Sequence, residues 1–353
     1  MEVKGNQEET LGKLLRLVKS GQLENIELAL EIGQSHSEFQ EKLEAYRKFY
    51  WVVFGEKATR ITPAHLLALT NAQKVSFFET GLAHLPQEVD ICTNMYRLNA
   101  NKNQLTLLPA EIGCLTNLKE LYLADNQLVA LPNSITQLNL HTLNLIGNKL
   151  RDLPENIGNI ASLILLDVGY NELNHLPESI SQMAKLRTLS IPGNKIRTLP
   201  KTIGQLTNLC FLEVYDNQLN DLPTSFNILE SLLELDLGHN QFETIPSQLF
   251  ELAGLEKLIL SRNQIKEVPA ELFQLPRLSF LDLHQCEITS LNFKSEDNIT
   301  LTTLNLSHNQ LENIPVSIQY LKKLNSLNLE GNPLSQEQVL QVQQWLPNCK
   351  IRF

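Results

Sequence analysis

The sequence has few positive charges, few cysteines and no apolar run long enough to cross a membrane. Lys and Arg number 29 against 39 Asp and Glu, which gives a formal net charge of −10. An acidic surface does not attract nucleic acid or an anionic membrane, so we expect neither as a partner. The five cysteines are scattered and odd in number, without the spacing of a disulfide framework or a zinc site. Residues 1–10 carry Glu and Gln where a secretory leader would be basic and apolar, so we expect a cytoplasmic protein.

Motifs of catalysis are also missing from the chain. There is no phosphate-binding loop, dinucleotide fingerprint, nucleophile elbow or His-Glu-x-x-His string. His284 and His308 fall one strand apart, but no third ligand is in register with them. We therefore expect no cofactor, no metal and no enzyme activity. A hydrolase that uses carboxylates on an open sheet is the less favoured alternative, because such a sheet lacks the desolvated pocket that tunes their pKa values.

An asparagine recurs at nearly constant spacing through most of the chain. Successive copies stand 23 residues apart, except for one step of 22 and one gap of 46, whose midpoint is Cys286. The asparagines are Asn103, Asn126, Asn148, Asn171, Asn194, Asn217, Asn240, Asn263, Asn309 and Asn332. Ten of the fifteen prolines stand six residues after a repeat position, nine of them after one of these asparagines and Pro86 after Thr80, one period before Asn103. The fixed φ of proline suits a return loop there. A period of this length indicates a solenoid of stacked units.

Each unit has its apolar residues at fixed offsets from the asparagine. A Leu-x-Leu segment before the anchor alternates apolar and polar residues, which predicts a short strand with one buried face. One such strand cannot close a core, but stacked units pair their strands in parallel and bury a column of leucines. The asparagine amide has donors and an acceptor that can satisfy backbone groups where the chain turns inward. The pattern predicts a ladder of these amides through the solenoid.

The full repeat resembles the leucine-rich repeat family, in its intracellular 23-residue class with the Leu-Pro-x-x-Ile turn. One unit shows the residues that carry the resemblance: Leu118, Leu121, Leu123, Asn126, Leu128, Leu131, Pro132 and Ile135. The match covers residues 72–334 in about twelve units. It implies an α/β solenoid with a curved parallel sheet on its concave face, and Cys286 is an accepted substitute for asparagine in the family pattern.

Two departures from the repeat lead to local predictions. Asn292 stands where proline is expected, and Ser295 and Asn298 stand where apolar residues should point inward. We expect the return segment 293–300 to be rebuilt on the convex side. One residue is missing before Leu140, which should shorten a loop without moving the strands.

The two ends of the chain lack the repeat. Residues 1–71 show helical periodicity in four segments, the last opened by Thr62 and Pro63. We interpret them as an all-α N-terminal domain that packs its aromatic residues 46–54 on the first repeat as a cap, and a second binding or dimerisation module is the alternative. Residues 335–353 predict a C-terminal cap formed by a helix and a closing edge strand.

The concave face is the surface on which we expect function. Strand residues beside the buried leucines must point onto it, and aromatic and acidic residues share these columns in the middle of the array. The predicted partner-binding residues are Tyr122, Leu165, Asp167, Tyr170, Phe211, Glu213, Tyr215, Asp216, Glu234, Asp236, His239, Phe280, Asp282 and His284. Exposed aromatics among charges are typical of a protein-binding hot spot. The alternative is that these side chains only pack against neighbouring columns.

The sequence therefore predicts a non-catalytic scaffold or recognition module in intracellular signalling. Its partner would be a protein or peptide with a basic and partly apolar surface, docked near Phe211 to Asp236. Three alternatives stay open: an exported effector or surface-recognition protein, the hydrolase mentioned above, and self-association through residues 1–71.

Overall fold

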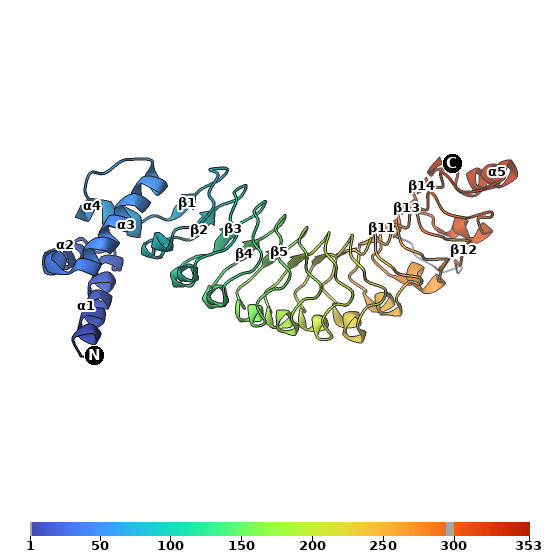
Figure 1. Ribbon diagram of the computed structural model, residues 1–353. Coiled ribbons are helices and arrows are strands. Elements are labelled where there is room, and N and C mark those ends of the chain that lie inside the picture. Colours follow the sequence, from blue (N-terminus) through green and yellow to red (C-terminus); the bar gives the residue numbers. More distant parts are fainter. Residues whose placement is uncertain (1, 294–299) are drawn as a thin grey trace. The chain divides into compact units, whose positions relative to one another are not determined.

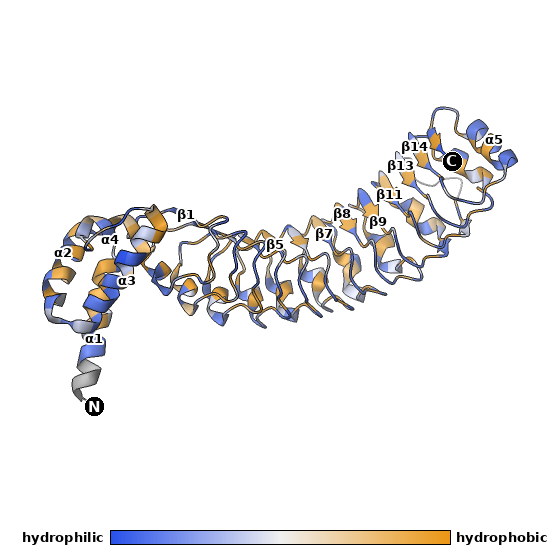
Figure 2. Cartoon of the chain, turned by 45° about the horizontal axis from the view of Figure 1, so that its top comes forward, coloured by the Kyte–Doolittle hydropathy of each residue, from blue (hydrophilic) through white to orange (hydrophobic). Residues whose placement is uncertain are grey.

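The computed structural model describes residues 2–293 and 300–353, which form two compact units. The first unit ends at Leu150 and the second begins at Arg151. In each unit the chain winds in successive coils, with a short strand on one side of every coil and helical turns on the other (Figure 1). Hydrophobic residues recur on each coil (Figure 2), as the repeat predicts.

Four α-helices open the first unit where the sequence predicted them. Their bounds are α1 Glu2–Lys19, α2 Leu23–Ile32, α3 Ser37–Phe54 and α4 Pro63–Thr70. Gly21, at a φ of +69°, follows α1, and Gly55 in the left-handed region ends α3. Thr62 caps α4, because its hydroxyl accepts from the backbone N–H of His65 while the His65 ring accepts from the N–H of Thr62.

Ionic and polar contacts join these helices to the first coil. Lys19 Nζ lies 2.6 Å from Asp90 Oδ2, and Lys42 Nζ lies 3.2 Å from Glu88 Oε1. The buried Tyr46 hydroxyl donates to Asp90 Oδ1 at 3.5 Å, and burial, aided by Asp90, raises the pKa of Tyr46 above its ordinary value. These contacts fasten α1 and α3 to the coil.

The aromatic cluster of residues 46–54 does not pack inward as a whole. Tyr46, Phe49 and Tyr50 are buried, but Trp51 is 49% exposed and Phe54 is 40% exposed. Helical geometry explains the split, because these residues fall on different sides of α3. The expectation that the entire cluster covers the first repeat is wrong for Trp51 and Phe54.

The strands of the first unit pair in parallel, in register with the repeat. They are β1 Lys74–Ser76, β2 Arg97–Asn99, β3 Glu120–Tyr122 and β4 Thr142–Asn144. Between β3 and β4 the register pairs Glu120 with Thr142, a step of 22 residues, and the ladder continues unbroken. The missing residue before Leu140 therefore shortens a loop and leaves the strands in place, as expected.

The second unit continues the same pattern. Its strands are β5 Leu165–Asp167, β6 Thr188–Ser190, β7 Phe211–Glu213, β8 Glu234–Asp236, β9 Lys257–Ile259, β11 Phe280–Asp282, β13 Thr303–Asn305, β14 Ser326–Asn328 and β15 Lys350–Arg352. All of these strands pair in parallel, in the order given. The central residue of each from β5 to β14 is a leucine that is at most 1% exposed, so every coil adds one strand leucine to a continuous core.

The asparagine ladder forms as predicted. Asn194 Nδ2 donates to the carbonyls of Val168, Ile191 and Pro192, each at 3.1 Å. Its Oδ1 accepts from the backbone N–H of Leu173 at 3.0 Å. One side chain thus satisfies buried backbone groups of its own coil and of the preceding coil.

The coil after Cys286 departs from the others. Cys286 Sγ donates to the carbonyl of Leu260 at 3.4 Å, the counterpart of one asparagine bond. On the return side β12 Ser290–Leu291 pairs in parallel with β10 Glu267–Val268 as a separate two-stranded sheet. The rings of Phe293 and Phe273 lie 4.4 Å apart between centroids. Ser295 and Asn298 lie outside the described residues, so the predicted rebuilding of 293–300 is described only at its two ends.

A helix and a strand end the second unit. The Ser335 hydroxyl accepts from the Gln338 N–H and begins α5 Gln336–Trp345. The chain then returns as β15, which pairs with β14. Both elements are those that the sequence predicted for this segment.

Candidate functional site

Aromatic and acidic side chains stand in register on neighbouring strands of the second unit. In β7, Leu212 is buried while Phe211 is half-buried and Glu213 is exposed. The β7–β8 register places Glu234 beside Phe211 and Asp236 beside Glu213. We call the residues that flank the buried leucines of β5 to β11 the strand face. Its first column contains Leu165, Thr188, Phe211, Glu234, Lys257 and Phe280, and its second column, which is mainly acidic, contains Asp167, Ser190, Glu213, Asp236, Ile259 and Asp282.

One basic residue lies within the strand face. Lys257 Nζ is 3.1 Å from Glu234 Oε2 and 5.9 Å from the ring centroid of Phe280. The sequence analysis did not select Lys257, although it stands at the same offset before Asn263 as Phe280 does before Cys286. The prediction of a basic partner favoured aromatic and acidic residues and gave a basic residue no role. Lys257 partly neutralises Glu234 and leaves Glu213 and Asp236 as the more negative part of the face.

The strand face encloses little space. A cavity of about 50 Å³ lies over β7, β8 and β9, bounded by side chains such as Phe211, Asp236 and Lys257. This volume is close to that of one or two water molecules. A cavity of this size is too small to surround a small molecule.

Three aspartates of the second column form a hydrogen bond with the backbone of their own turn. Asp167, Asp236 and Asp282 each accept a hydrogen bond from the backbone N–H two residues later, at 2.9–3.1 Å. Glu213 instead accepts from the Ser190 hydroxyl at 2.8 Å. The aspartates therefore help to close the turn after each strand, a role that the sequence analysis did not foresee.

In the same column, burial and a neighbouring carboxylate make ionisation of Asp167 and Asp236 less favourable. Burial raises the pKa of Asp167 and of Asp236 above the ordinary value; the backbone bonds act in the opposite direction, and Glu213 adds to the increase in both. Lys257 lowers the pKa of Asp236 and Asp282 raises it. A cation brought close to this column would relieve the repulsion among the carboxylates.

The predicted residues that precede each asparagine lie in the turns after the strands. Tyr170 and Tyr215 meet there, with hydroxyl oxygens 2.7 Å apart and ring centroids 6.4 Å apart. Tyr170 is 48% exposed, and burial is the main reason why the pKa of Tyr215 is raised. His239 Nδ1 lies 2.8 Å from Asp216 Oδ1. The structure therefore places these residues in a second row, next to the strand columns.

The remaining predicted residues have separate surroundings. Leu165 on β5 and Phe280 on β11 are half-buried, and His284 Nδ1 lies 3.0 Å from Asp282 Oδ1. Tyr122 belongs to the first unit, where its hydroxyl donates to Glu120 Oε2 at 3.0 Å. The structure thus brings together the predicted residues of the second unit, and Tyr122 stands in a setting of its own.

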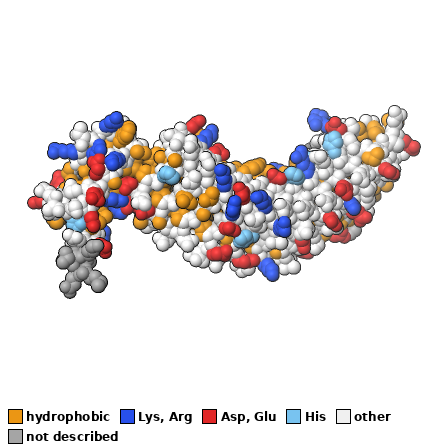
Figure 3. All heavy atoms as spheres, in the orientation of Figure 1, with side chains coloured by type: hydrophobic (Ala, Val, Ile, Leu, Met, Phe, Trp, Pro, Cys, Tyr) orange, Lys and Arg blue, Asp and Glu red, His pale blue; other side chains and the backbone are white. Residues whose placement is uncertain are grey.

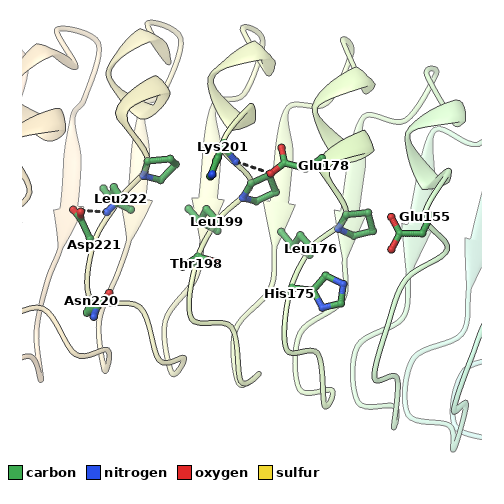
Figure 4. Close-up of a pocket in the computed structure, with 13 residues that line it drawn as sticks. Glu155, His175, Leu176, Glu178, Thr198, Leu199, Lys201, Asn220, Asp221 and Leu222 are labelled. Atoms are coloured by element: carbon green, nitrogen blue, oxygen red, sulfur yellow. Dashed lines mark hydrogen bonds between the residues drawn. The ribbon is translucent and has the colours of Figure 1, made fainter.

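A groove on the opposite, Leu-Pro side of the coils is a feature that the sequence analysis missed. It has a volume of about 490 Å³, and Figure 4 shows its residues on successive coils. Glu178 accepts from the backbone N–H groups of Lys201 and Thr202 at 3.0 and 3.3 Å and from the Thr202 hydroxyl at 2.6 Å. The hydroxyl bond is the largest cause of the lowered pKa of Glu178. The sequence predicts these prolines as turn residues, and the polar residues beside the Leu-Pro pairs, such as Glu155, Glu178 and Lys201, were the available signal.

Within residues 2–293 and 300–353, no three His, Cys, Asp or Glu side chains are grouped so that they could hold a metal ion. None of the helices described there combines the length and the apolarity needed to span a bilayer.

Family models match the chain in four segments. Each is described as a leucine rich repeat, and the matched residues are 117–138, 139–196, 231–288 and 300–321. No curated protein sequence matches the chain.

Solved structures share the fold over most of the chain. A leucine-rich repeat protein of Leptospira interrogans is 32% identical with a TM-score of 0.57, and the match covers 77% of this chain and 82% of that one. An internalin of Listeria monocytogenes, 21% identical with a TM-score of 0.64, matches 88% of this chain and 94% of its own. At that identity the likeness to the internalin concerns the fold alone.

A plant receptor is also similar. The ectodomain of the membrane receptor kinase GASSHO1/SCHENGEN3 of Arabidopsis thaliana, solved in complex with Casparian strip integrity factor 2, is 27% identical with a TM-score of 0.63. The match covers 80% of this chain and 38% of the receptor chain, so this chain spans well under half of that relative.

Proposed function

The chain belongs to the leucine-rich repeat family, and from that premise we propose that it is a non-catalytic interaction module whose strand face binds a protein or peptide. The observation that carries the proposal is the in-register grouping of Phe211, Glu213, Glu234 and Asp236 on β7 and β8. Aromatic side chains surrounded by charged side chains on a shallow surface are typical of a binding hot spot. The Arabidopsis receptor, whose structure includes a second named factor, supports a macromolecular ligand.

The proposed partner is basic and partly apolar. Glu213 and Asp236 repel one another on adjacent strands, so a Lys or Arg of the partner would be stabilised between them. Lys257 already pairs with Glu234 and directs the partner's cation away from that carboxylate. The ring of Phe211 offers apolar contact at the same place.

We further propose an intracellular signalling scaffold of the 23-residue Leu-Pro-x-x-Ile class, located in the cytoplasm. In this proposal residues 1–71 and 335–353 are caps on the repeats of residues 72–334, and the contacts of Lys19 and Tyr46 with Asp90 support the first cap. An exported effector is the competing role. Fractionation of the native cell distinguishes the two, because recovery outside the cytoplasm would contradict the scaffold.

The binding proposal is tested by selection of peptides on the purified chain. We expect peptides from a random library to be enriched in Lys or Arg next to an apolar residue. A Phe211→Ala/Glu213→Lys variant should bind them at least about tenfold more weakly, or about 1.4 kcal/mol. Glu213 is preferred over Asp236 for the charge reversal because Asp236 accepts a backbone bond.

The matched control is Glu251→Lys. Glu251 is exposed on the helical turn of the opposite side of the coil, so this variant makes the same charge change away from the strand face. Peptide affinity equal to wild type in the double variant would overturn the proposal, provided that circular dichroism shows both variants folded.

A further inference from the structure

One segment of the N-terminal helical region has a charge opposite to that of the whole chain. Residues 47–60 contain four basic residues and one acidic residue, Glu56, while the chain has a net charge of −10. We call Arg47, Lys48, Trp51, Lys57 and Arg60 the Trp51 surface. Figure 3 shows basic and hydrophobic side chains side by side on the helical part of the first unit.

Large apolar side chains are exposed at the same place. Trp51, Val52 and Phe54, in the last turn of α3, are 49%, 43% and 40% exposed. Gly55 at a φ of +73° ends the helix directly after them. Three neighbouring exposed apolar side chains next to cations are more than the isolated exposed residues of an ordinary surface.

The Trp51 surface is hollowed. A cavity of about 520 Å³ is lined by Arg47, Lys48, Trp51, Lys57, Ala58 and Thr59. Its walls are held in place, because Arg47 forms two hydrogen bonds with the Glu44 carboxylate, at 2.7 and 2.6 Å, and a third with the Ala58 carbonyl at 2.7 Å. Lys57 Nζ lies 4.9 Å from the ring centroid of Trp51.

Two cations of the cavity are available to a ligand. Within residues 2–293 and 300–353, neither Lys48 nor Lys57 has a carboxylate within ion-pair distance. Arg47, by contrast, is already paired with Glu44, and Arg60 is exposed in the same segment without lining the cavity. A ligand that brings carboxylates would therefore pair with two cations, and it would bury the exposed face of Trp51.

We propose that the Trp51 surface binds an acidic peptide segment of a partner protein, with one aromatic or large aliphatic side chain of the peptide in the cavity and its carboxylates on Lys48 and Lys57. A hollow suits an inserted side chain better than it suits a flat membrane. The basic residues surround one cavity and do not form the long stripe that follows a nucleic-acid backbone.

The experiment measures the fluorescence anisotropy of a dye-labelled eight-residue peptide that has a central Phe flanked by Asp and Glu. We expect the full chain to bind it, with affinity that falls as salt rises. The Lys48→Glu/Lys57→Glu variant and the Trp51→Ala variant should each bind at least about tenfold more weakly. A peptide with Lys in place of every acidic residue should bind Lys48→Glu/Lys57→Glu no more weakly than it binds the wild type, because its binding does not depend on these cations.

Control variants locate the effect. Lys13→Glu/Arg16→Glu makes the same charge change on exposed residues of α1 and should keep wild-type affinity. Phe211→Ala/Glu213→Lys should also keep it, so failure of the strand-face proposal and failure of this one are distinguishable. The proposal is overturned if the peptide does not bind, or if Lys48→Glu/Lys57→Glu binds it as wild type does.

Two further probes separate the other partner classes. Vesicles that contain phosphatidylserine and a ten-nucleotide thymidine strand are each offered to the wild type and to Lys48→Glu/Lys57→Glu. We expect neither probe to bind more tightly than the acidic peptide. Tighter binding of either one, lost in the variant, would assign the surface to a membrane or to nucleic acid and overturn the proposal.

Discussion

Each ladder asparagine connects two coils at once, and this explains why one residue type recurs through the chain. Asn217 Nδ2 donates to the carbonyls of Ile191 and Val214, at 3.0 and 3.1 Å, and its Oδ1 accepts from the Ile196 N–H at 3.0 Å. A side chain that could not both donate and accept would leave a buried backbone group unpaired, which costs more than the bond itself contributes. Cys286 replaces these bonds with weaker thiol contacts to the carbonyls of Leu260 and His284, at 3.4 and 3.8 Å.

Replacement of one ladder residue tests this cost. We expect Asn194→Ala to lower the free energy of unfolding by roughly 2–4 kcal/mol, because several buried backbone groups lose their partner. Asn194→Cys should cost less, since a thiol at this position can keep the kind of contact that Cys286 has. Urea denaturation monitored by circular dichroism measures both variants, and equal losses would contradict the explanation.

The acidic column makes a prediction about pH. Burial raises the pKa of Asp236 from its ordinary value of 3.8, so ionisation is less favourable in the folded chain than in the unfolded one. Stability from this group is present below pH 3.8 and is lost as the pH rises through the raised value. Asp236→Asn should therefore melt close to wild type at pH 3 and above it at pH 7. Asparagine can keep the backbone bond, as Asn305 does with the Ser307 N–H at 3.2 Å.

Asp236→Ala is the control for that prediction. It removes the charge and also the bond to the Gly238 N–H at 2.9 Å, so we expect a lower melting temperature than that of Asp236→Asn at every pH. Thermal melts from pH 3 to pH 7 measure the difference. A wild type more stable than Asp236→Asn at pH 7 would show that ionised Asp236 is favourable in the fold.

At the scale of elements, the turns after the strands decide how closely neighbouring coils approach. Gly193 has a φ of +61°, and a Cβ added to it would lie 2.6 Å from the ring of Tyr170. The ring crosses over Gly193 and reaches Tyr215, two coils beyond its own. Glycine is thus required twice here, for its backbone conformation and for the space that the tyrosine occupies.

A double-mutant cycle separates the two requirements. Gly193→Ala should cost about 1–3 kcal/mol through strain and overpacking. In a Tyr170→Ala background the same change should cost less, by at least about 0.5 kcal/mol, because only the backbone strain remains. Urea unfolding of the four proteins gives the coupling, and strict additivity would show that the ring does not restrict residue 193.

At the scale of the whole molecule, a coil contacts its neighbours along the chain, so damage should stay local. We expect Asn126→Ala to speed backbone hydrogen exchange most in residues 100–150, with little change beyond residue 230. Hydrogen–deuterium exchange with mass spectrometry measures the profile. Asn240→Ala serves as the control and should displace the fast region toward residues 214–263. The same uniform increase in both variants would show that the chain opens as one cooperative unit.

Much of the architecture could be predicted from the sequence because the repeat averages over many coils. The ladder, the strand register and the helix begun by Ser335 all depend on local patterns that identical neighbours reinforce. The outward surfaces could not be predicted as well. Phe211 and Glu213 lie on the strand face, and their role in binding stays a prediction. Lys257, in the same column as Phe211, was not predicted, because a basic partner gave a basic residue no role.

The sequence by itself determined the family, the coil and the inward residues, because the burial of a column of leucines leaves one regular solution for a 23-residue period. Only the tertiary structure decided what each outward side chain contacts. It paired Tyr170 with Tyr215 across two coils, gave Asp236 a backbone bond and left Trp51 exposed beside Lys57. Such contacts depend on the distances between residues far apart in the sequence, which a local pattern does not contain.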